Sequence, residues 1–180
     1  NKQRIVQLKN GIDKTNETTS VEIQKSLKNS SSEIGLILTS DIDFIKDSQT
    51  YIVTVPTPIT IAKTPDLGPL KSASKMIGKF LSNDDLVIYE STVYPGCTEE
   101  VCVPILESTS GLVFNKDFFC GYSPERINPG DKVNTLTKIK KVTSGSNAAI
   151  AKKVNELYKS IISAGTHLAS SIKVAEASKV

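Results

Sequence analysis

The segment Gly121–Asp131 (GYSPERINPGD) holds a carboxylate and a guanidinium, Glu125 and Arg126, between two prolines. It directly follows the apolar run Phe118–Cys120, which indicates a buried strand. Because prolines fix φ and remove backbone donors, we expect a stiff loop at the end of this strand. Open α/β sheets bind ligands outside the carboxyl ends of their strands, so the loop is a candidate reaction site. A solvated turn with incidental charges is the alternative interpretation.

Two other expected strands also end in polar loops. The run Thr50–Val55 (TYIVTV) ends in Pro56-Thr57-Pro58, and Leu86–Tyr89 (LVIY) is followed by Ser91 and Thr92. The first run is apolar enough to lie buried on both faces of a sheet. Hydroxyls and backbone N–H groups at strand ends can hold phosphates or ribose, and a carboxylate can act as acid or base. We therefore expect the three loops to lie side by side on one edge of the sheet.

The rest of the chain alternates between helical and extended patterns. We expect helices at residues 2–8, 21–27, 70–81, 99–108 (with Thr98 as N-cap), 147–164 and 171–180, and strands at 34–39, 50–55, 86–89, 118–121, 139–143 and 166–170. Such alternation is typical of βαβ units. The pattern predicts a doubly wound α/β fold, with a mostly parallel Rossmann-like sheet and helices on both faces.

Composition excludes several classes of protein. The chain has 180 residues, of which 38% are hydrophobic and 23% charged, and a net charge of +3, as expected for a soluble globular protein. It has no basic run with interleaved aromatic residues, so we expect no nucleic-acid partner. No apolar stretch approaches the roughly 18–20 residues that cross a bilayer, so we expect no membrane partner.

Cysteine and histidine usage argues against a metal site. The three cysteines are odd in number and irregularly spaced, which predicts free thiols in the cytoplasm. The chain has one histidine and no closely spaced Cys/His pairs, so we expect no zinc site. Cys97 lies near an expected helix N-terminus and is a possible nucleophile; a small buried residue in a tight turn is the favoured interpretation, since no His or Lys is near it.

The glycine-rich loop G-x-G-x-x-G of dinucleotide-binding folds is not found in this chain. In such folds it occupies the first βα turn, and an acidic residue follows the second strand. The chain also has no initiator Met and reads as an excerpt of a longer protein. We therefore expect a sheet that lacks its first βαβ segment.

Four motifs together resemble the UDP-glucose/GDP-mannose dehydrogenase family. They are Val55-Pro-Thr-Pro58, Glu90-Ser-Thr-Val-Tyr-Pro-Gly96, Tyr122-Ser-Pro-Glu-Arg-Ile-Asn-Pro-Gly130 and Val174-Ala-Glu-Ala-Ser-Lys179. The version SPERINPGD is most similar to the UDP-N-acetylhexosamine branch, used in bacterial capsular and Vi-type polysaccharide synthesis. The family oxidises the sugar C6 alcohol twice, with two NAD molecules, through a thiohemiacetal on a cysteine. The resemblance thus implies NAD as cofactor and a UDP-sugar as substrate.

The resemblance also implies roles for individual residues. Glu125 resembles the acid/base that manages water and protons in thioester hydrolysis, Lys179 the residue that stabilises the oxyanion, and Thr92 the one that positions the catalytic water beside the nicotinamide. Arg4 matches a basic residue near the adenosine end of NAD. The remaining expected NAD contacts are Thr54, Val55, Pro56, Thr57, Pro58 and Ser91. The expected sugar contacts are Glu125, Arg126, Ile127, Asn128, Pro129 and Lys179.

Departures from the family pattern limit what this chain can do. Some UDP-glucose enzymes have a second Glu where this chain has Pro129. The nucleophilic cysteine of the family belongs to a region after Val180, so none of the chain's own cysteines takes that role, and the chain alone should be inactive. We expect an NAD-binding domain at residues 1–165, then the last strand and the start of a central helix at 166–180, which in the family usually builds a homodimer. A nucleotide- or sugar-binding module without catalysis is the alternative.

Overall fold

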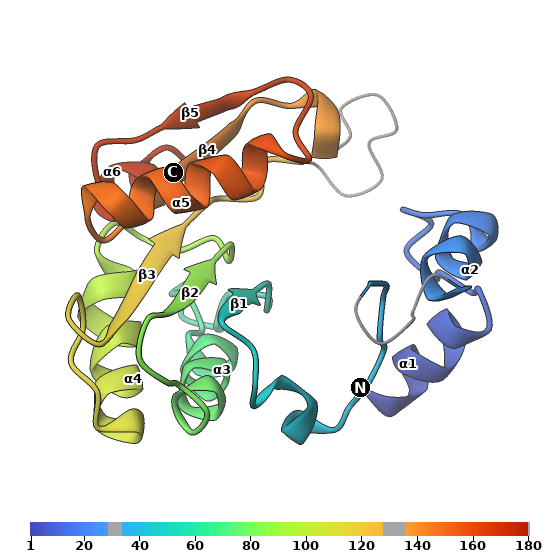
Figure 1. Cartoon of the computed structure of the whole chain (residues 1–180), viewed down its shortest axis with the longest axis horizontal. Coiled ribbons are helices and arrows are strands. Elements are labelled where there is room, and N and C mark those ends of the chain that lie inside the picture. Colours follow the sequence, from blue (N-terminus) through green and yellow to red (C-terminus); the bar gives the residue numbers. More distant parts are fainter. Residues whose placement is uncertain (29–33, 128–135, 180) are drawn as a thin grey trace. The chain divides into compact units, whose positions relative to one another are not determined.

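The computed structural model describes residues 1–28, 34–127 and 136–179 (Figure 1). They divide into two compact units. The first contains the described residues up to Lys46, and the second contains Asp47–Ile127 together with residues 136–179. Each unit is treated by itself. The domain boundary expected at residue 165 stays a prediction.

The second unit is built on a sheet of five strands among the described residues, in the order β1-β2-β3-β4-β5. The strands are β1 (Thr50–Val53), β2 (Asp85–Tyr89), β3 (Phe118–Tyr122), β4 (Lys141–Gly145) and β5 (Thr166–Leu168). β1, β2 and β3 are parallel to one another, and β5 is parallel to β4. β4 runs antiparallel to β3, with Gly121 opposite Gly145 and Tyr122 opposite Ser144. The mostly parallel sheet is confirmed, with one reversed pairing that the sequence pattern did not predict.

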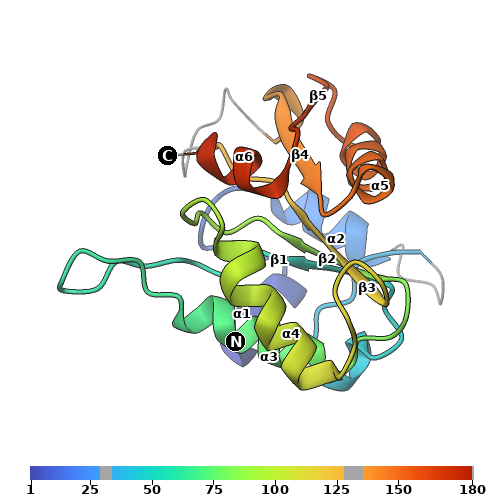
Figure 2. The ribbon, with the colours of Figure 1, turned by 90° about the vertical axis from the view of Figure 1, so that its left-hand side faces the viewer.

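Helices cover both faces of this sheet, as expected (Figure 2). They are α3 (Gly68–Gly78), α4 (Val103–Ser110), α5 (Ala148–Lys159) and α6 (Ile172–Ala177). On one face, Ser74 of α3 shares a hydrogen bond of 2.7 Å with the buried Tyr89 hydroxyl. On the other, Leu86 and Ile88 of β2 pack with residues of α5, including Val154. Because successive residues of a strand point to opposite faces, α3 and α5 lie on opposite sides of the sheet.

The reversal of β4 explains which face each helix covers. The connections β1–α3–β2 and β2–α4–β3 run between parallel strands in one direction across the sheet, and α3 packs against α4. Crossovers between parallel strands are right-handed as a rule. The connection β4–α5–β5 continues in the same direction but starts from a reversed strand. A right-handed crossover then places α5 on the opposite face.

Strand β1 is buried on one face only, so the expectation of burial on both faces is wrong. Tyr51 and Val53 are buried, whereas Ile52 is 48% exposed. The Ile52 face continues the Leu86 and Ile88 face of β2, which α5 covers. β1 lies at the edge of the described sheet, whereas α5 packs mainly on β3, β4 and β5 and reaches β2 at Leu86 and Ile88, so Ile52 stays uncovered.

The first unit consists of short helices in its described residues. They are α1 (Lys2–Lys9), α2 (Ser20–Lys28) and a 3₁₀ turn at Ile42–Ile45 that Asp41 caps. Asn10 caps the C-terminus of α1, and Gly11 follows with φ +73°. The strand expected at residues 34–39 is wrong: these residues form none, because the described part of this unit contains no strand with which they could pair.

Several helix boundaries also differ from the expectation: the helix expected at residues 70–81 is Gly68–Gly78, and the one expected at 171–180 ends at Ala177. The helix expected at residues 147–164 ends at Lys159. The helix expected at 99–108 begins with a π-helical segment, Thr98–Cys102, before α4. Thr98 therefore lies inside the helical segment and is not its cap. None of the helices in the described residues is both long and apolar enough to cross a membrane.

Candidate functional site

The three polar loops lie at one edge of the sheet and are joined by hydrogen bonds. The Ser91 hydroxyl donates to the carbonyl of Val55 at 2.6 Å, which joins the loop after β2 to the loop after β1. The Tyr122 hydroxyl donates to the carbonyl of Ser91 at 3.1 Å, and the Ser123 amide donates to the carbonyl of Tyr89 at 3.0 Å. Parallel strands end on the same side, so the adjacency of the loops follows from the topology.

Glu125 is held by its own loop. Its Oε1 accepts hydrogen bonds from the backbone N–H groups of Arg126 at 2.6 Å and Ile127 at 2.7 Å. Pro124, before it, is buried, and the Glu125 side chain is 39% exposed. One carboxylate oxygen is thus fixed by the turn, and the side chain still reaches the surface. Arg126 is exposed. Asn128 and Pro129, which we expected to contact the sugar, lie outside the described residues.

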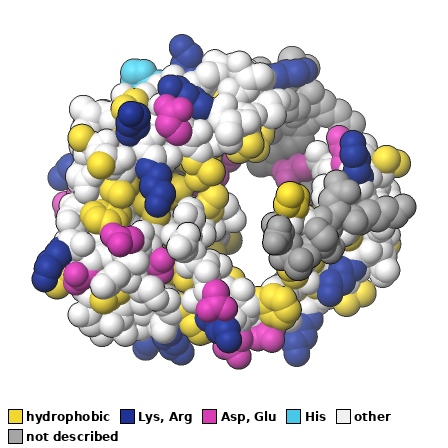
Figure 3. Space-filling model, viewed as in Figure 1, with side chains coloured by type: hydrophobic (Ala, Val, Ile, Leu, Met, Phe, Trp, Pro, Cys, Tyr) yellow, Lys and Arg dark blue, Asp and Glu magenta, His cyan; other side chains and the backbone are white. Residues whose placement is uncertain are grey.

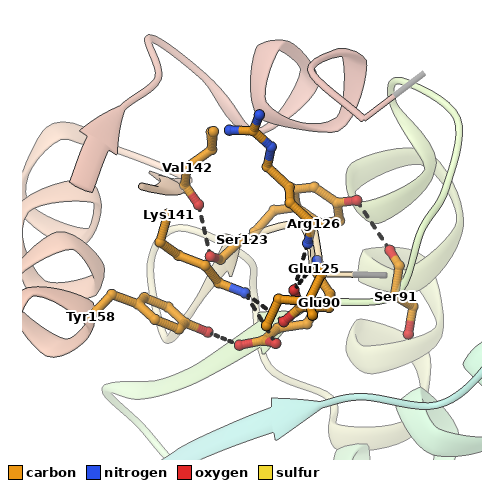
Figure 4. A network of polar contacts seen from close by, with 10 residues as sticks. Glu90, Ser91, Ser123, Glu125, Arg126, Lys141, Val142 and Tyr158 are labelled. Atoms are coloured by element: carbon orange, nitrogen blue, oxygen red, sulfur yellow. Dashed lines mark hydrogen bonds and ion pairs between the residues drawn. The ribbon is translucent and has the colours of Figure 1, made fainter. Parts of the chain in front are cut away.

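The structure adds a cluster that sequence reasoning missed, formed by Glu90, Glu125, Lys141 and Tyr158, here called the carboxylate–lysine cluster (Figure 4). Lys141 Nζ lies 3.4 Å from Glu90 Oε2 and 3.4 Å from Glu125 Oε2. The Tyr158 hydroxyl donates to Glu90 Oε1, and Lys141 Nζ lies 5.4 Å from the centroid of the Tyr158 ring. A signal existed in the sequence: one lysine of the expected strand IKKVT had to point into a buried face.

The antiparallel pairing of β4 brings Lys141 to this cluster. Lys141 is the first residue of β4, and β4 runs against β3, so its beginning lies where β3 ends. In a parallel β4 the same residue would lie at the far edge. Tyr158 lies in the last turn of α5, which returns across the sheet from the end of β4. Burial, and then the charge and hydrogen bond of Glu90, raise the pKa of Tyr158 well above its ordinary value, so its hydroxyl is neutral and donates.

The loop after β1 contains a threonine hydroxyl that makes no hydrogen bond to the described residues. Thr57 Oγ1 is buried and has no partner among the described residues. A buried polar atom without a partner costs free energy, so such an atom at a strand end fits a site that a ligand completes. The neighbouring side chains of Thr54, Pro56 and Pro58 are exposed. These residues fit the ribose or phosphate of a dinucleotide; their contact with NAD stays a prediction.

Helix α6 is tied to the loop after β2 by Glu176. This residue is fully buried, and its carboxylate accepts hydrogen bonds from the backbone N–H groups of Gly96 at 2.5 Å and Thr98 at 2.9 Å. Lys179 follows one turn later and is half-buried, whereas Thr92, in the tethered loop, is exposed. Glu176 therefore fixes the segment that carries Lys179 against the segment that carries Thr92. The catalytic roles of both residues stay predictions.

The three cysteines are buried. A hydrogen bond to Cys102 and burial raise the pKa of Cys97, and burial raises the pKa of Cys120. Buried thiols cannot reach a ligand, so their packing agrees with the interpretation of Cys97 as a small core residue. Among residues 1–28, 34–127 and 136–179, no three His, Cys, Asp or Glu side chains gather as a metal site would require.

In the first unit, Arg4 of α1 forms an ion pair with Asp13 in the loop that follows this helix. Arg4 Nη2 lies 2.5 Å from Asp13 Oδ1, whose side chain is only 3% exposed. Arg4 Nη1 is buried and has no partner in the described part of the chain. The guanidinium is thus oriented by Asp13 and keeps one donor group for a ligand. Its contact with the adenosine of NAD stays a prediction.

Charged side chains of both signs are scattered over the visible face of the described residues (Figure 3).

A family model described as the NAD binding domain of the UDP-glucose/GDP-mannose dehydrogenase family matches residues 1–162. The chain belongs to this family. It contains the family's NAD binding domain, as the resemblance of its strand-end motifs predicted.

Individual members of the dehydrogenase family resemble the chain over its whole length. It is 58% identical to the UDP-N-acetyl-D-glucosamine 6-dehydrogenase of Salmonella typhi and 56% identical to that of Pseudomonas aeruginosa, in each case over 100% of this chain and 41% of the relative. The crystal structure of NDP-N-acetyl-D-galactosaminuronic acid dehydrogenase from Methanosarcina mazei superimposes with a TM-score of 0.89 at 28% identity, over 99% of this chain and 38% of that chain. The chain therefore spans less than half the length of these relatives.

Proposed function

We propose that this chain is the NAD-binding part of an NAD-dependent nucleotide-sugar 6-dehydrogenase. The enzyme oxidises the C6 alcohol of a UDP-N-acetylhexosamine, or of a UDP-hexose, to the uronic acid for polysaccharide synthesis. The observation that carries the proposal is the 58% identity over the whole chain to a UDP-N-acetyl-D-glucosamine 6-dehydrogenase. The position of Glu125 at the edge formed by the three loops supports it.

In the proposed reaction, the residues of this chain bind NAD and the sugar and orient them. Bound NAD would supply the hydride acceptor for the oxidation at C6. Thr54, Val55, Pro56, Thr57, Pro58 and Ser91 line its site, and Arg4 binds near its adenosine. Oxidation of an alcohol to an acid removes four electrons and adds one oxygen atom from water, so two NAD molecules are reduced for each sugar.

The residue that transfers protons lies in the loop after β3. Glu125, fixed through one oxygen by its own turn, accepts the proton of the water that releases the acid. Thr92 orients this water, and the Lys179 ammonium stabilises the oxyanion. Arg126, Ile127, Asn128 and Pro129 hold the sugar. The nucleophilic cysteine lies outside this chain, so the chain alone is inactive.

We further infer a cytoplasmic homodimer. The buried free thiols suit a reducing compartment, and the helix that begins with α6 is the expected dimer element. Size-exclusion chromatography with light scattering on the whole dehydrogenase tests the dimer, and a monomer contradicts it.

The production of NADH separates the proposed enzyme from a binding module without catalysis. With UDP-N-acetyl-D-glucosamine and NAD, we expect the whole dehydrogenase to form two NADH for each sugar oxidised. Titration calorimetry with the same UDP-sugar provides the control. Binding without NADH formation supports the binding module and overturns the proposal.

A further inference from the structure

Lys141 is a buried cation between two carboxylates. The residue is 3% exposed, and its Nζ lies 3.4 Å from an oxygen of Glu90 and 3.4 Å from an oxygen of Glu125. A lysine is almost never fully buried unless it is paired, because removing its ammonium from water is expensive. The two carboxylates compensate this charge. The three side chains therefore form one group of paired charges.

Among these three side chains only Glu125 is open to a ligand. The side chain of Lys141 is 4% exposed, that of Glu90 15%, and that of Glu125 39%. The second oxygen of Glu90 is occupied by the hydroxyl of Tyr158. A substrate at this edge of the sheet can therefore touch Glu125 but not Lys141. Any effect of Lys141 on the reaction must act through its neighbour.

The contacts hold both oxygens of Glu125. Oε1 accepts from the amides of Arg126 and Ile127, and Oε2 faces the Lys141 ammonium. The ammonium is itself confined, because it lies 5.4 Å from the centroid of the Tyr158 ring and pairs with Glu90. We propose that Lys141 is a positioning residue that fixes the orientation of the Glu125 carboxylate, with Glu90 and Tyr158 holding the lysine in place.

The inference rests on the proposed function, since the acid–base role of Glu125 belongs to that proposal. Its test is Lys141→Met in the whole dehydrogenase, with UDP-N-acetyl-D-glucosamine and NAD. We expect kcat to fall about 10- to 100-fold, because a misplacement of about 1 Å can cost on the order of 100-fold. The KM values should stay within about twofold, since Lys141 touches neither ligand. The matched control is Lys153→Met, which removes an exposed lysine of α5 and should leave kcat unchanged.

A second variant separates positioning from folding. Lys141→Met alone leaves two carboxylates near one another without a cation, which destabilises the fold. Lys141→Met/Glu90→Gln removes one of these charges and keeps an oxygen to accept from Tyr158. We expect the melting temperature to return toward that of the wild type while kcat stays low. If kcat recovers together with the melting temperature, Lys141 is only structural and the inference is overturned.

A crystal structure of the Lys141→Met variant tests the inference without turnover. We expect the Glu125 side chain to leave its present orientation, and an unchanged Glu125 overturns the inference. Wild-type protein that forms no NADH with a UDP-sugar overturns the proposed function instead, and the position of Glu125 in the variant still decides the structural claim.

Discussion

Glu176 Oε1 accepts a hydrogen bond of 2.9 Å from the backbone N–H of Thr98. A residue of α6 therefore pairs with a backbone donor at the beginning of the helical segment after β2. Helix N-termini leave backbone donors unpaired and attract negative charge. The carboxylate is fully buried and also accepts from the amide of Gly96. This tether joins two segments that the proposed reaction needs in one place, since one carries Thr92 and the other Lys179.

We expect Glu176→Gln to lower the free energy of unfolding by about 1–3 kcal/mol, because the amide NH₂ must face a buried backbone donor. Urea unfolding of the whole dehydrogenase measures the loss. The control is Glu156→Gln on the exposed face of α5, whose ion pair with Lys159 should contribute less than about 1 kcal/mol. Equal effects of the two substitutions contradict the role given to Glu176.

Thr57→Val tests the buried hydroxyl of the loop after β1. Because Thr57 Oγ1 is buried and has no partner among the described residues, its loss should not lower the free energy of unfolding. We expect the KM for NAD to rise about 2- to 10-fold, since one hydrogen bond contributes ~0.5–1.5 kcal/mol. Thr64→Val in the same connection, whose hydroxyl bonds to Thr60 at 2.8 Å, is the control and should leave this KM unchanged. An unaltered KM in Thr57→Val removes the residue from the cofactor site.

Glu125→Gln keeps the shape of the side chain but removes its ability to accept a proton. Acid release should slow, and we expect kcat to fall about 10²- to 10⁴-fold, the usual contribution of a general acid or base. Steady-state NADH formation measures the effect, and Glu100→Gln, at an exposed residue, is the control. Turnover equal to that of the wild type shows that the role proposed for Glu125 is wrong.

Asp13 gives the first unit a predictable dependence on pH. The Arg4 guanidinium holds the pKa of Asp13 well below its usual range, with help from hydrogen bonds of Thr15 and Thr18. A carboxyl whose pKa is lowered on folding adds stability that is fully present above its unfolded pKa of about 4 and is lost as the pH falls toward the folded value. At pH 7 we expect Asp13→Asn to cost about 1–3 kcal/mol.

The difference between Asp13→Asn and the wild type should shrink as the pH falls below about 4, because protonation also removes the charge from the wild-type side chain. Urea unfolding from pH 3 to pH 8 follows this change. Glu17→Gln, at an exposed residue of the same loop, should show no such difference. A constant cost of Asp13→Asn at every pH contradicts the ion pair as its cause.

Local sequence was sufficient for the three adjacent strands and their loops. Each of the runs at residues 50–55, 86–89 and 118–121 corresponds to a strand, and the parallel order brings the loops to one edge. Periodicity and proline act over a few residues, so they are readable without the fold. The same reasoning failed at residues 34–39, because a strand forms only beside a partner strand.

The sequence by itself determined that Glu125 stands on a stiff loop after a buried strand, since neighbouring prolines and apolar residues impose that conformation. Only the tertiary structure decided what surrounds it. The reversed direction of β4 brings Lys141 to Glu125, the return of α5 brings Tyr158 to Glu90, and the docking of α6 places Glu176 at the start of a helical segment. These contacts join residues far apart in the chain, and the direction of a strand and the packing of a helix depend on the whole core rather than on local sequence.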